Sequence, residues 1–187
     1  PIMVRINLTE ENLISTTGIA DRRFADHSGD IQHGYQLGSL TEGLVAYYPM
    51  EKGQGQVLHD GAFDNLGQNE GGIWATGNIG SNALDFNGLS TYANIGKLGS
   101  FGSSDIDNDF TVTYWVKVNT FSDFMNVVGH TDGNNTGQRF MSRFSGRGIN
   151  SVEFYLSDQN GTRQEVYTND NVLTQGTWHH VVISKQG

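Results

Sequence analysis

The feature that most constrains this chain is a strict alternation of residue type between positions 110 and 118. The apolar positions are Phe110, Val112, Tyr114, Val116 and Val118. The positions between them are Thr111, Thr113, Trp115 and Lys117. Because successive side chains of a β-strand point to opposite faces of a sheet, the pattern predicts a strand with one uniformly apolar face. Such a face must be covered by a second layer.

Further short runs have the composition of strands and are separated by turn-forming residues. They span 44–48, 83–86, 92–95, 124–129, 139–144, 152–156, 163–167 and 178–184. Glycine, asparagine and aspartate gather between them, for example at 132–135 and 158–161, and these residue types favour tight turns. Many short strands at this spacing predict an all-β, antiparallel two-sheet sandwich of the jelly-roll kind.

Charge and composition exclude several classes of function. The chain has 20 acidic and 11 basic residues, a formal net charge of −9, and no cysteine. We expect no binding to nucleic acid, because that affinity depends on neutralising phosphates with basic side chains. The absence of cysteine excludes disulfides, thiolate catalysis and sulfur-ligated zinc. No apolar run approaches the ~18 residues of a membrane span, so we expect no membrane insertion.

The chain divides near residue 40. Residues 1–40 are polar and contain too few apolar side chains for a core of their own. We expect them to form an extended N-terminal arm that attaches to other chains of an assembly, or a simple linker. Residues 41–187 are expected to form the main domain. The first residues lack the basic start and long apolar centre of an intact secretory signal.

Six segments, in order, resemble those of the laminin G-like, concanavalin A-like lectin/glucanase jelly-roll domains. They are 43–49 with 53–55; Asp60, Asp64 and Asn65; Trp74 and Gly80; 83–88; 110–116; and 177–182. The resemblance covers roughly residues 43–187 and implies a concanavalin A-like sandwich. In the family a further hairpin and a closing strand normally follow the last of these segments. The resemblance therefore implies that the C-terminal strands are missing here, or that a neighbouring chain supplies them.

The resemblance also raises the question of a calcium ion, because related jelly rolls often hold one beside the sugar-binding edge. Asp60, Asp64 and Asn65 carry the hard oxygen atoms that calcium prefers. The same residue types also make turns without any metal. Both alternatives stay open at the level of the sequence.

Three aromatic residues are candidates for carbohydrate binding, since a flat ring stacks on the apolar face of a pyranose. Trp74, Tyr92 and Phe121 lie in or near predicted loops, where a ring can be exposed. A packing role is the alternative for each of them. Trp115 and Trp178 lie inside predicted strands, and we expect them in the core.

Laminarinases and related glycan-cleaving enzymes share this sandwich, so catalysis must be considered. Their chemistry needs two carboxyl groups about 5 Å apart in retaining enzymes, contributed in this family by alternate residues of one strand. No predicted strand contains such a pair. We therefore expect a non-catalytic protein.

Together these features predict a recognition or adhesion module that binds carbohydrate or a surface receptor. The polar arm, the missing signal and the incomplete sandwich together favour a viral setting, and we expect the module to be part of a virion or of a cell-surface structural assembly. Its expected location is accordingly a virion, the cell surface or the extracellular space. The alternatives are a purely structural virion or appendage protein without glycan binding, and a glycan-cleaving enzyme.

Overall fold

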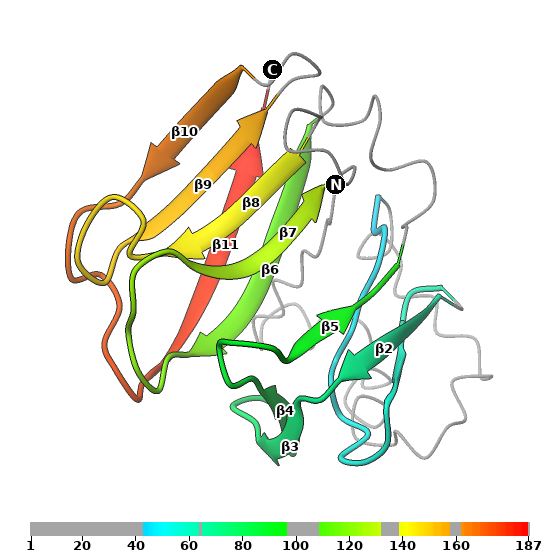
Figure 1. Cartoon of the computed structure of the whole chain (residues 1–187). Helices are drawn as coiled ribbons and strands as arrows, with labels where there is room; N and C mark the ends of the chain where they lie inside the picture. Colours follow the sequence, from blue (N-terminus) through cyan, green and yellow to red (C-terminus); the bar gives the residue numbers. More distant parts are fainter. Residues whose placement is uncertain (1–42, 64, 97–108, 132–138, 158–161, 187) are drawn as a thin grey trace, which may run out of the picture. The chain divides into compact units, whose positions relative to one another are not determined.

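The computed structural model describes residues 43–63, 65–96, 109–131, 139–157 and 162–186 (Figure 1). Every strand pairing in these ranges is antiparallel. The same ranges contain no helix, and so none long and apolar enough to cross a membrane. The expected all-β antiparallel architecture is confirmed. The predicted arm at 1–40, Asp64 and the predicted turns at 132–135 and 158–161 lie outside the described residues.

Eleven strands form in the described ranges, and they fall into two compact units, at 43–96 and 109–186. The first unit holds β1 (Val57–His59), β2 (Leu66–Glu70), β3 (Ile73–Thr76), β4 (Asn82–Asp85) and β5 (Tyr92–Asn94). The second holds β6 (Phe110–Lys117), β7 (Met125–Thr131), β8 (Arg139–Phe144), β9 (Val152–Ser157), β10 (Arg163–Tyr167) and β11 (Trp178–Lys185).

The first unit contains a three-stranded sheet, in the order β1–β2–β5, and the β3–β4 hairpin. The strand predicted at 44–48 is wrong, because this segment has no ladder of strand pairing. Instead, the backbone of Tyr47 bonds to the loop after β1: its N–H donates to Asp60 Oδ1 at 2.7 Å, and its carbonyl accepts from Gly61 N at 2.6 Å. Ala46 is fully buried. The apolar residues at 44–48 therefore reflect burial of an irregular segment and not the formation of a strand.

The second unit has two layers: a four-stranded sheet in the order β10–β9–β8–β7, and the pair β11–β6 behind it (Figure 1). The ring of Phe110 on β6 lies 6.1 Å from those of Phe140 on β8 and Phe154 on β9, between centroids. The Tyr114 hydroxyl is 2.6 Å from Ser142 Oγ across the same interface. These contacts confirm the stacked layers that the alternation predicts.

The alternation along β6 sets which side chains enter the core. Phe110 and Val112 are almost completely buried, as is Val118 just after the strand. Trp115, on the opposite face, is 42% exposed and stacks on His180 with ring centroids 4.9 Å apart. The prediction that Trp115 lies in the core is wrong, because its position in the strand directs it outward.

Candidate functional site

The second unit has a surface hollow of about 590 Å³ where three loops meet. The loops connect β6 to β7 (118–124), β8 to β9 (145–151) and β10 to β11 (168–177). Its apolar lining includes Phe121, Phe124 and Ile149, and its charged lining consists of Asp123, Arg147 and Asp170. An open hollow with apolar surface and a few polar groups is the usual form of a binding site for a small ligand.

Unfavourable backbone geometry is concentrated at this hollow. Phe124, Ser145 and Asn150 line it and have positive φ angles of 57°, 52° and 52°. Asn171, next to the lining residue Asp170, has a φ of 58°. The left-handed region costs most non-glycine residues, such as Phe124 and Ser145, roughly 1–2 kcal/mol, whereas asparagine adopts it more readily. Such strain gathers at functional sites, where the surrounding structure holds a conformation that the local sequence disfavours.

Backbone hydrogen bonds between the loops hold the hollow together. Phe124 N–H donates to the Ser145 carbonyl at 3.4 Å and so ties the first loop to the second. Asn171 N–H donates to the Ile149 carbonyl at 2.7 Å, and Leu173 N–H to the Asn150 carbonyl at 3.1 Å. The third loop is thereby fixed to the second. The lining residues are therefore positioned by the framework, although they come from three separate stretches of sequence.

Two phenylalanines give the hollow its aromatic surface, and their surroundings differ. Phe121 is half-buried and packs against the cluster of Val118, Phe144 and Leu173. Phe124 is 56% exposed, and the guanidinium carbon of Arg143 lies 4.8 Å from its ring centroid. Phe121 thus belongs partly to the core, whereas Phe124 presents much of its ring to solvent.

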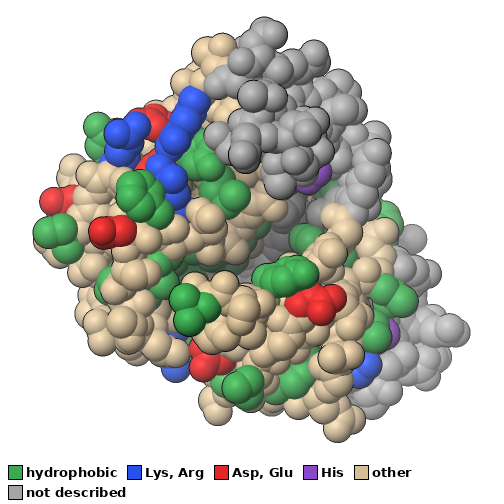
Figure 2. All heavy atoms as spheres, viewed as in Figure 1, with side chains coloured by type: hydrophobic (Ala, Val, Ile, Leu, Met, Phe, Trp, Pro, Cys, Tyr) green, Lys and Arg blue, Asp and Glu red, His purple; other side chains and the backbone are tan. Residues whose placement is uncertain are grey.

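Next to the hollow is a set of ion pairs on β8, β9, β10 and the 145–151 loop, here named the arginine–glutamate network: Arg143, Arg147, Glu153, Arg163 and Glu165. Basic and acidic side chains gather over β9 and β10 in Figure 2. Glu153 is fully buried, and its Oε1 accepts from Arg143 Nη2 at 2.7 Å and from Arg163 Nη2. Glu165 lies 2.9 Å from Arg163 Nη2 and 2.6 Å from Arg147 Nη2. The network links the sheet to the lining residue Arg147.

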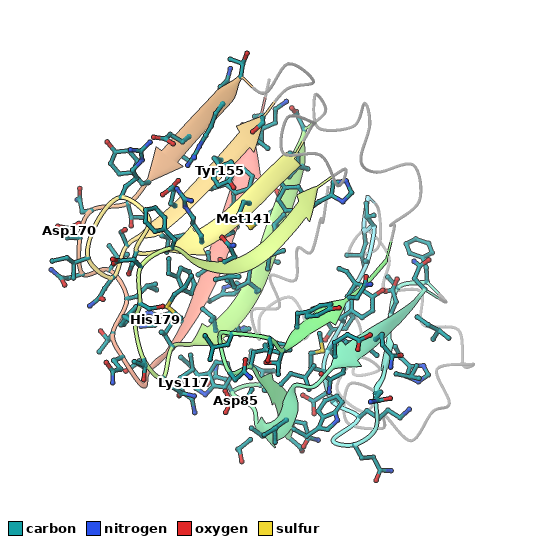
Figure 3. The ribbon with its side chains drawn as sticks, in the orientation of Figure 1. Asp85, Lys117, Met141, Tyr155, Asp170 and His179 are labelled. Carbon is teal, nitrogen blue, oxygen red and sulfur yellow. The ribbon has the colours of Figure 1, made fainter. Side chains whose placement is uncertain are left out.

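Tyr155 on β9, labelled in Figure 3, supports two arginines of the network. Its ring centroid is 3.8 Å from the guanidinium carbon of Arg163 and 5.2 Å from that of Arg143. A planar guanidinium stacks on an aromatic face more readily than an ammonium does. The tyrosine therefore fixes the arginines that hold Glu153.

Four side-chain atoms of the network are buried without a hydrogen-bond partner in the described part of the chain: Arg143 Nε, Glu153 Oε2, Arg163 Nε and Glu165 Oε2. Two of them, Glu153 Oε2 and Arg143 Nε, lie against Gly146. Both lie where a Cβ at Gly146 would stand, so only a glycine fits without displacing them. Gly146 lines the hollow. Neither Glu153 nor Arg143 is among the lining residues, so these two atoms contact Gly146 rather than the hollow itself.

The structure treats the three predicted carbohydrate-binding aromatics differently. Phe121 lines the hollow. Trp74 and Tyr92 belong to the first unit and are not among the lining residues. Trp74 Nε1 donates to the Gly55 carbonyl at 2.9 Å, which anchors the ring, while Tyr92 on β5 is 56% exposed. A binding role for any of the three stays a prediction.

Asp60 and Asn65, two of the predicted calcium ligands, bond to each other. Asp60 is buried; its Oδ1 accepts from the N–H groups of Tyr47 and Ala62 at 2.7 and 2.9 Å, and its Oδ2 accepts from Asn65 Nδ2 at 2.9 Å. Asp64 lies outside the described residues. Across the ranges that the structure covers, no three His, Cys, Asp or Glu side chains form a metal-binding group. Calcium binding stays a prediction.

The sequence did not single out Phe124 in the hollow, nor Glu153 and Glu165 in the adjoining arginine–glutamate network. In the sequence, Phe124 is the first residue of the strand predicted at 124–129. Its exposure depends on its left-handed backbone conformation, which the sequence does not indicate. Glu153 and Glu165 come from adjacent strands, so a search for acids at i and i+2 cannot find them. One signal was present: Gly146 and Gly148 flank Arg147 in a glycine-rich connection between two predicted strands.

Comparison with known families identifies the stretch that carries this hollow. The model of the concanavalin A-like lectin/glucanases superfamily matches residues 86–187, more than half of the chain. The match includes all of β6 to β11 and every residue that lines the hollow. No curated protein and no solved structure matches the chain.

Proposed function

Because the chain belongs to the concanavalin A-like lectin/glucanases superfamily, we propose that it is a non-catalytic recognition module that binds carbohydrate through this hollow. The observation that carries the proposal is the position of Phe124. This residue lines the hollow, is 56% exposed and has a backbone φ of 57°. An exposed ring on a strained backbone gains little for stability, whereas it provides a flat surface for the apolar face of a sugar.

The polar lining complements that ring. Asp123 and Asp170 supply carboxylate acceptors, Asn150 supplies an amide with both donors and an acceptor, and Arg147 supplies further donors. A sugar has the matching construction, with apolar C–H faces and hydroxyl groups around its edge. An aromatic surface in a hollow that also has polar lining residues therefore suits a saccharide better than a purely apolar ligand.

The arginine–glutamate network supports a binding role rather than catalysis. Glu153 and Glu165 are a carboxylate pair on neighbouring strands, and one nitrogen, Arg163 Nη2, contacts both of them. Glycoside hydrolysis needs one carboxyl group that donates a proton and another that attacks or activates water, and both must reach the sugar. A fully buried carboxylate held by two guanidinium groups is poorly placed for either task. Release of reducing ends from a panel of β-glucans, abolished by Glu153→Gln, would contradict the proposal and support the glycan-cleaving alternative.

The binding test uses a glycan array to find ligands, followed by calorimetric titration of the best one. We expect Phe124→Ala to weaken binding about tenfold, equivalent to about 1.4 kcal/mol. Phe63→Ala is the matched control, because Phe63 is 54% exposed but belongs to the first unit. Unchanged affinity in Phe124→Ala, or an equal loss in Phe63→Ala, would contradict the assignment of this hollow.

We further propose that the module works within a virion or a cell-surface assembly, attached through residues 1–40. The support is the polar composition of that segment, which lies outside the described residues. Native mass spectrometry of the 187-residue chain should show species larger than the 20.5 kDa monomer. A strictly monomeric chain would contradict attachment to like chains. Assembly without any glycan binding would support the purely structural alternative.

A further inference from the structure

We propose that residues 2–8 form a strand that pairs with the outer edge of β11 in the same chain, on the side of β10. The outer edge is the side of Trp178–Ser184 that faces away from β6. This inference goes beyond the proposed function and does not depend on carbohydrate binding. It follows from the unequal widths of the two layers, from an apolar side chain that the narrower layer leaves exposed, and from the residue pattern at 2–8.

The two layers of the second unit differ in width. One layer has the four strands β10–β9–β8–β7, and the other has the two strands β11–β6. Within the described ranges β6 is the one strand that pairs with β11, so the outer edge carries no strand there. In Figure 1, β11 lies on the same side of β6 as β9 and β10, and its outer edge is therefore turned toward the β10 side of the unit. The backbone groups along such an edge are a template for a further strand.

Val166 on β10 shows what the narrower layer leaves uncovered. It pairs with Phe154 of β9, and directly opposite residues of two paired strands point to the same face of the sheet. Phe154 is buried and packs against Phe110 of β6, so this face is the one turned toward the narrower layer. Val166 is nevertheless 65% exposed. The pair β11–β6 therefore does not extend far enough to cover β10.

A strand added to the outer edge of β11 would widen the narrower layer toward β10. Neighbouring strands lie about 4.7–4.9 Å apart, and stacked sheets lie about 10 Å apart. The inward-facing side chains of the added strand must be apolar, because they would meet the exposed Val166. The side chains on its other face meet solvent and can be polar. The strand therefore needs an alternation of residue type over about the eight residues of β11.

Residues 2–8 have this alternation, although they lie outside the described residues. The even positions are all apolar and the odd positions are mixed: Ile2, Val4, Ile6 and Leu8 alternate with Met3, Arg5 and Asn7. Branched apolar residues at every second position favour a strand with one apolar face. The segment has seven residues, against eight in β11. A second alternation, at 31–37, is weaker, because His33 stands among its apolar positions and Gly34 among its polar ones.

The length of the connection favours pairing within one chain. Residues 9–42 lie between this segment and the first described residue. An extended chain spans about 3.3–3.6 Å per residue, so the connection can span on the order of 100 Å, more than the ~30 Å diameter of a small domain. A covalently joined segment that can reach its site has an effective concentration of up to about millimolar, well above that of a second copy in dilute solution.

The experiment introduces pairs of cysteines into the full 187-residue chain, which has no cysteine of its own. Val182→Cys is kept constant, because Val182 is 56% exposed on the face of β11 that points away from the core. Opposite residues in paired strands have Cα atoms about 4.5–5.5 Å apart, which is within the range of a disulfide. The second cysteine is placed in turn at the odd positions, by Met3→Cys, Arg5→Cys or Asn7→Cys, and at the even positions, by Val4→Cys or Ile6→Cys.

The direction of the side chains supplies the control. An odd-numbered cysteine shares the outward face with Val182→Cys, whereas an even-numbered one points to the opposite face and cannot be bridged to it. After mild oxidation we expect an internal disulfide in at least one odd-numbered variant and in neither even-numbered one. Non-reducing gels and intact mass detect the disulfide, and the product should have the mass of a monomer.

Amide hydrogen exchange tests the pairing without a cross-link. Every second N–H group of an edge strand points away from its partner, and a further paired strand protects these groups. Ile6→Asp places a charge on the inward face of the segment and should speed exchange along the outer edge of β11 by about tenfold or more. Asn7→Asp is the matched control, because it adds the same charge at the next position, on the outward face. It should keep the protection.

Other results overturn the proposal and leave carbohydrate binding by the hollow unaffected. The absence of a cross-link in every variant, or cross-links at odd and even positions alike, would exclude a paired strand at 2–8. A cross-linked dimer would show that the segment pairs with a second copy. Cross-linking through Gln32→Cys or Gln36→Cys instead would assign the edge to residues 31–37. Protection that survives Ile6→Asp would show that another segment covers the edge.

Discussion

Arg143 and Glu153 face each other directly across the pairing of β8 and β9, and Arg143 Nη2 donates to Glu153 Oε1 at 2.7 Å. Glu153 is nevertheless fully buried, where an isolated carboxylate would cost several kcal/mol. Arg163 donates to the same oxygen from β10. The three side chains therefore depend on one another, and the 145–151 loop lies against them through Gly146.

Glu153→Gln should lower the free energy of unfolding by about 3 kcal/mol, because it leaves two guanidinium groups without their shared counterion. Urea unfolding followed by circular dichroism measures the change. Glu165→Gln is the control: that side chain is 24% exposed and its pairs are partly screened, so we expect a loss below about 1 kcal/mol. Equal losses in the two variants would show that burial does not distinguish the two carboxylates.

Gly146→Ala and Gly148→Ala should differ in stability although both lie in one loop. A Cβ at Gly146 meets the Glu153 carboxylate and the Arg143 guanidinium, which are fixed by ion pairs. A Cβ at Gly148 meets Asp170, an exposed side chain that can rotate away. We expect losses of about 2 kcal/mol for the first variant and below about 0.5 kcal/mol for the second. Thermal and urea unfolding compare them, and the reverse order would contradict the packing at Gly146.

Tyr114→Phe should change the pH dependence of stability in alkaline solution. Burial raises the pKa of Tyr114 well above its ordinary value of 10.0, although the hydrogen bond to Ser142 opposes this shift. Above about pH 10 the unfolded chain releases this proton while the folded chain keeps it, so the free energy of unfolding falls as pH rises. The stabilisation that comes from this pKa shift is present in full below about pH 10. Above that pH it falls by at most about 1.4 kcal/mol per pH unit.

The difference between wild type and Tyr114→Phe isolates this residue from the other tyrosines. Urea unfolding at several pH values from about 8 to about 11 should give curves that converge as the pH rises. At neutral pH the variant should be less stable by about 1 kcal/mol, since Ser142 loses a partner in the interior. Parallel curves would show that Tyr114 titrates normally in the folded state.

His179→Phe should loosen the loop between β10 and β11. His179 Nε2 accepts the backbone N–H of Thr174 at 2.9 Å, and this loop also carries Asp170 of the hollow (Figure 3). We expect faster amide hydrogen exchange at Thr174 and a loss of about 1 kcal/mol in stability. His59→Phe is a control at an exposed position of β1 in the first unit. It should leave exchange at Thr174 unchanged.

Asp60→Ala should destabilise the first unit, because three N–H groups lose their acceptor: those of Tyr47, Ala62 and the Asn65 amide. A loss of about 2 kcal/mol is expected in calcium-free buffer. If Asp60, Asp64 and Asn65 also hold calcium, millimolar calcium should raise the melting temperature of the wild type, and a chelator should reverse the rise. If neither calcium nor the chelator changes the melting temperature of the wild type, these residues form a turn and do not bind calcium.

The strands of the second unit could be predicted closely from sequence, since a period of two and flanking turn residues are local signals. The predictions at 139–144 and 163–167 coincide with β8 and β10, and 178–184 is one residue shorter than β11. The segment 44–48 shows the limit of such signals. An apolar run is equally compatible with a strand and with an irregular buried segment, and only the hydrogen-bond partner of Tyr47 distinguishes them.

The amino-acid sequence alone determined the class of architecture and the buried face of β6. The reason is that successive side chains of a strand point to opposite faces of the sheet, so alternating apolar and polar residues give one apolar face. The hollow was decided by tertiary structure. Phe124 became exposed through hydrogen bonding between loops, and Glu153 found its partners through the registers of β8, β9 and β10. Register and loop packing join residues that are distant in sequence, and the energies that select them exist only once the sheets have formed.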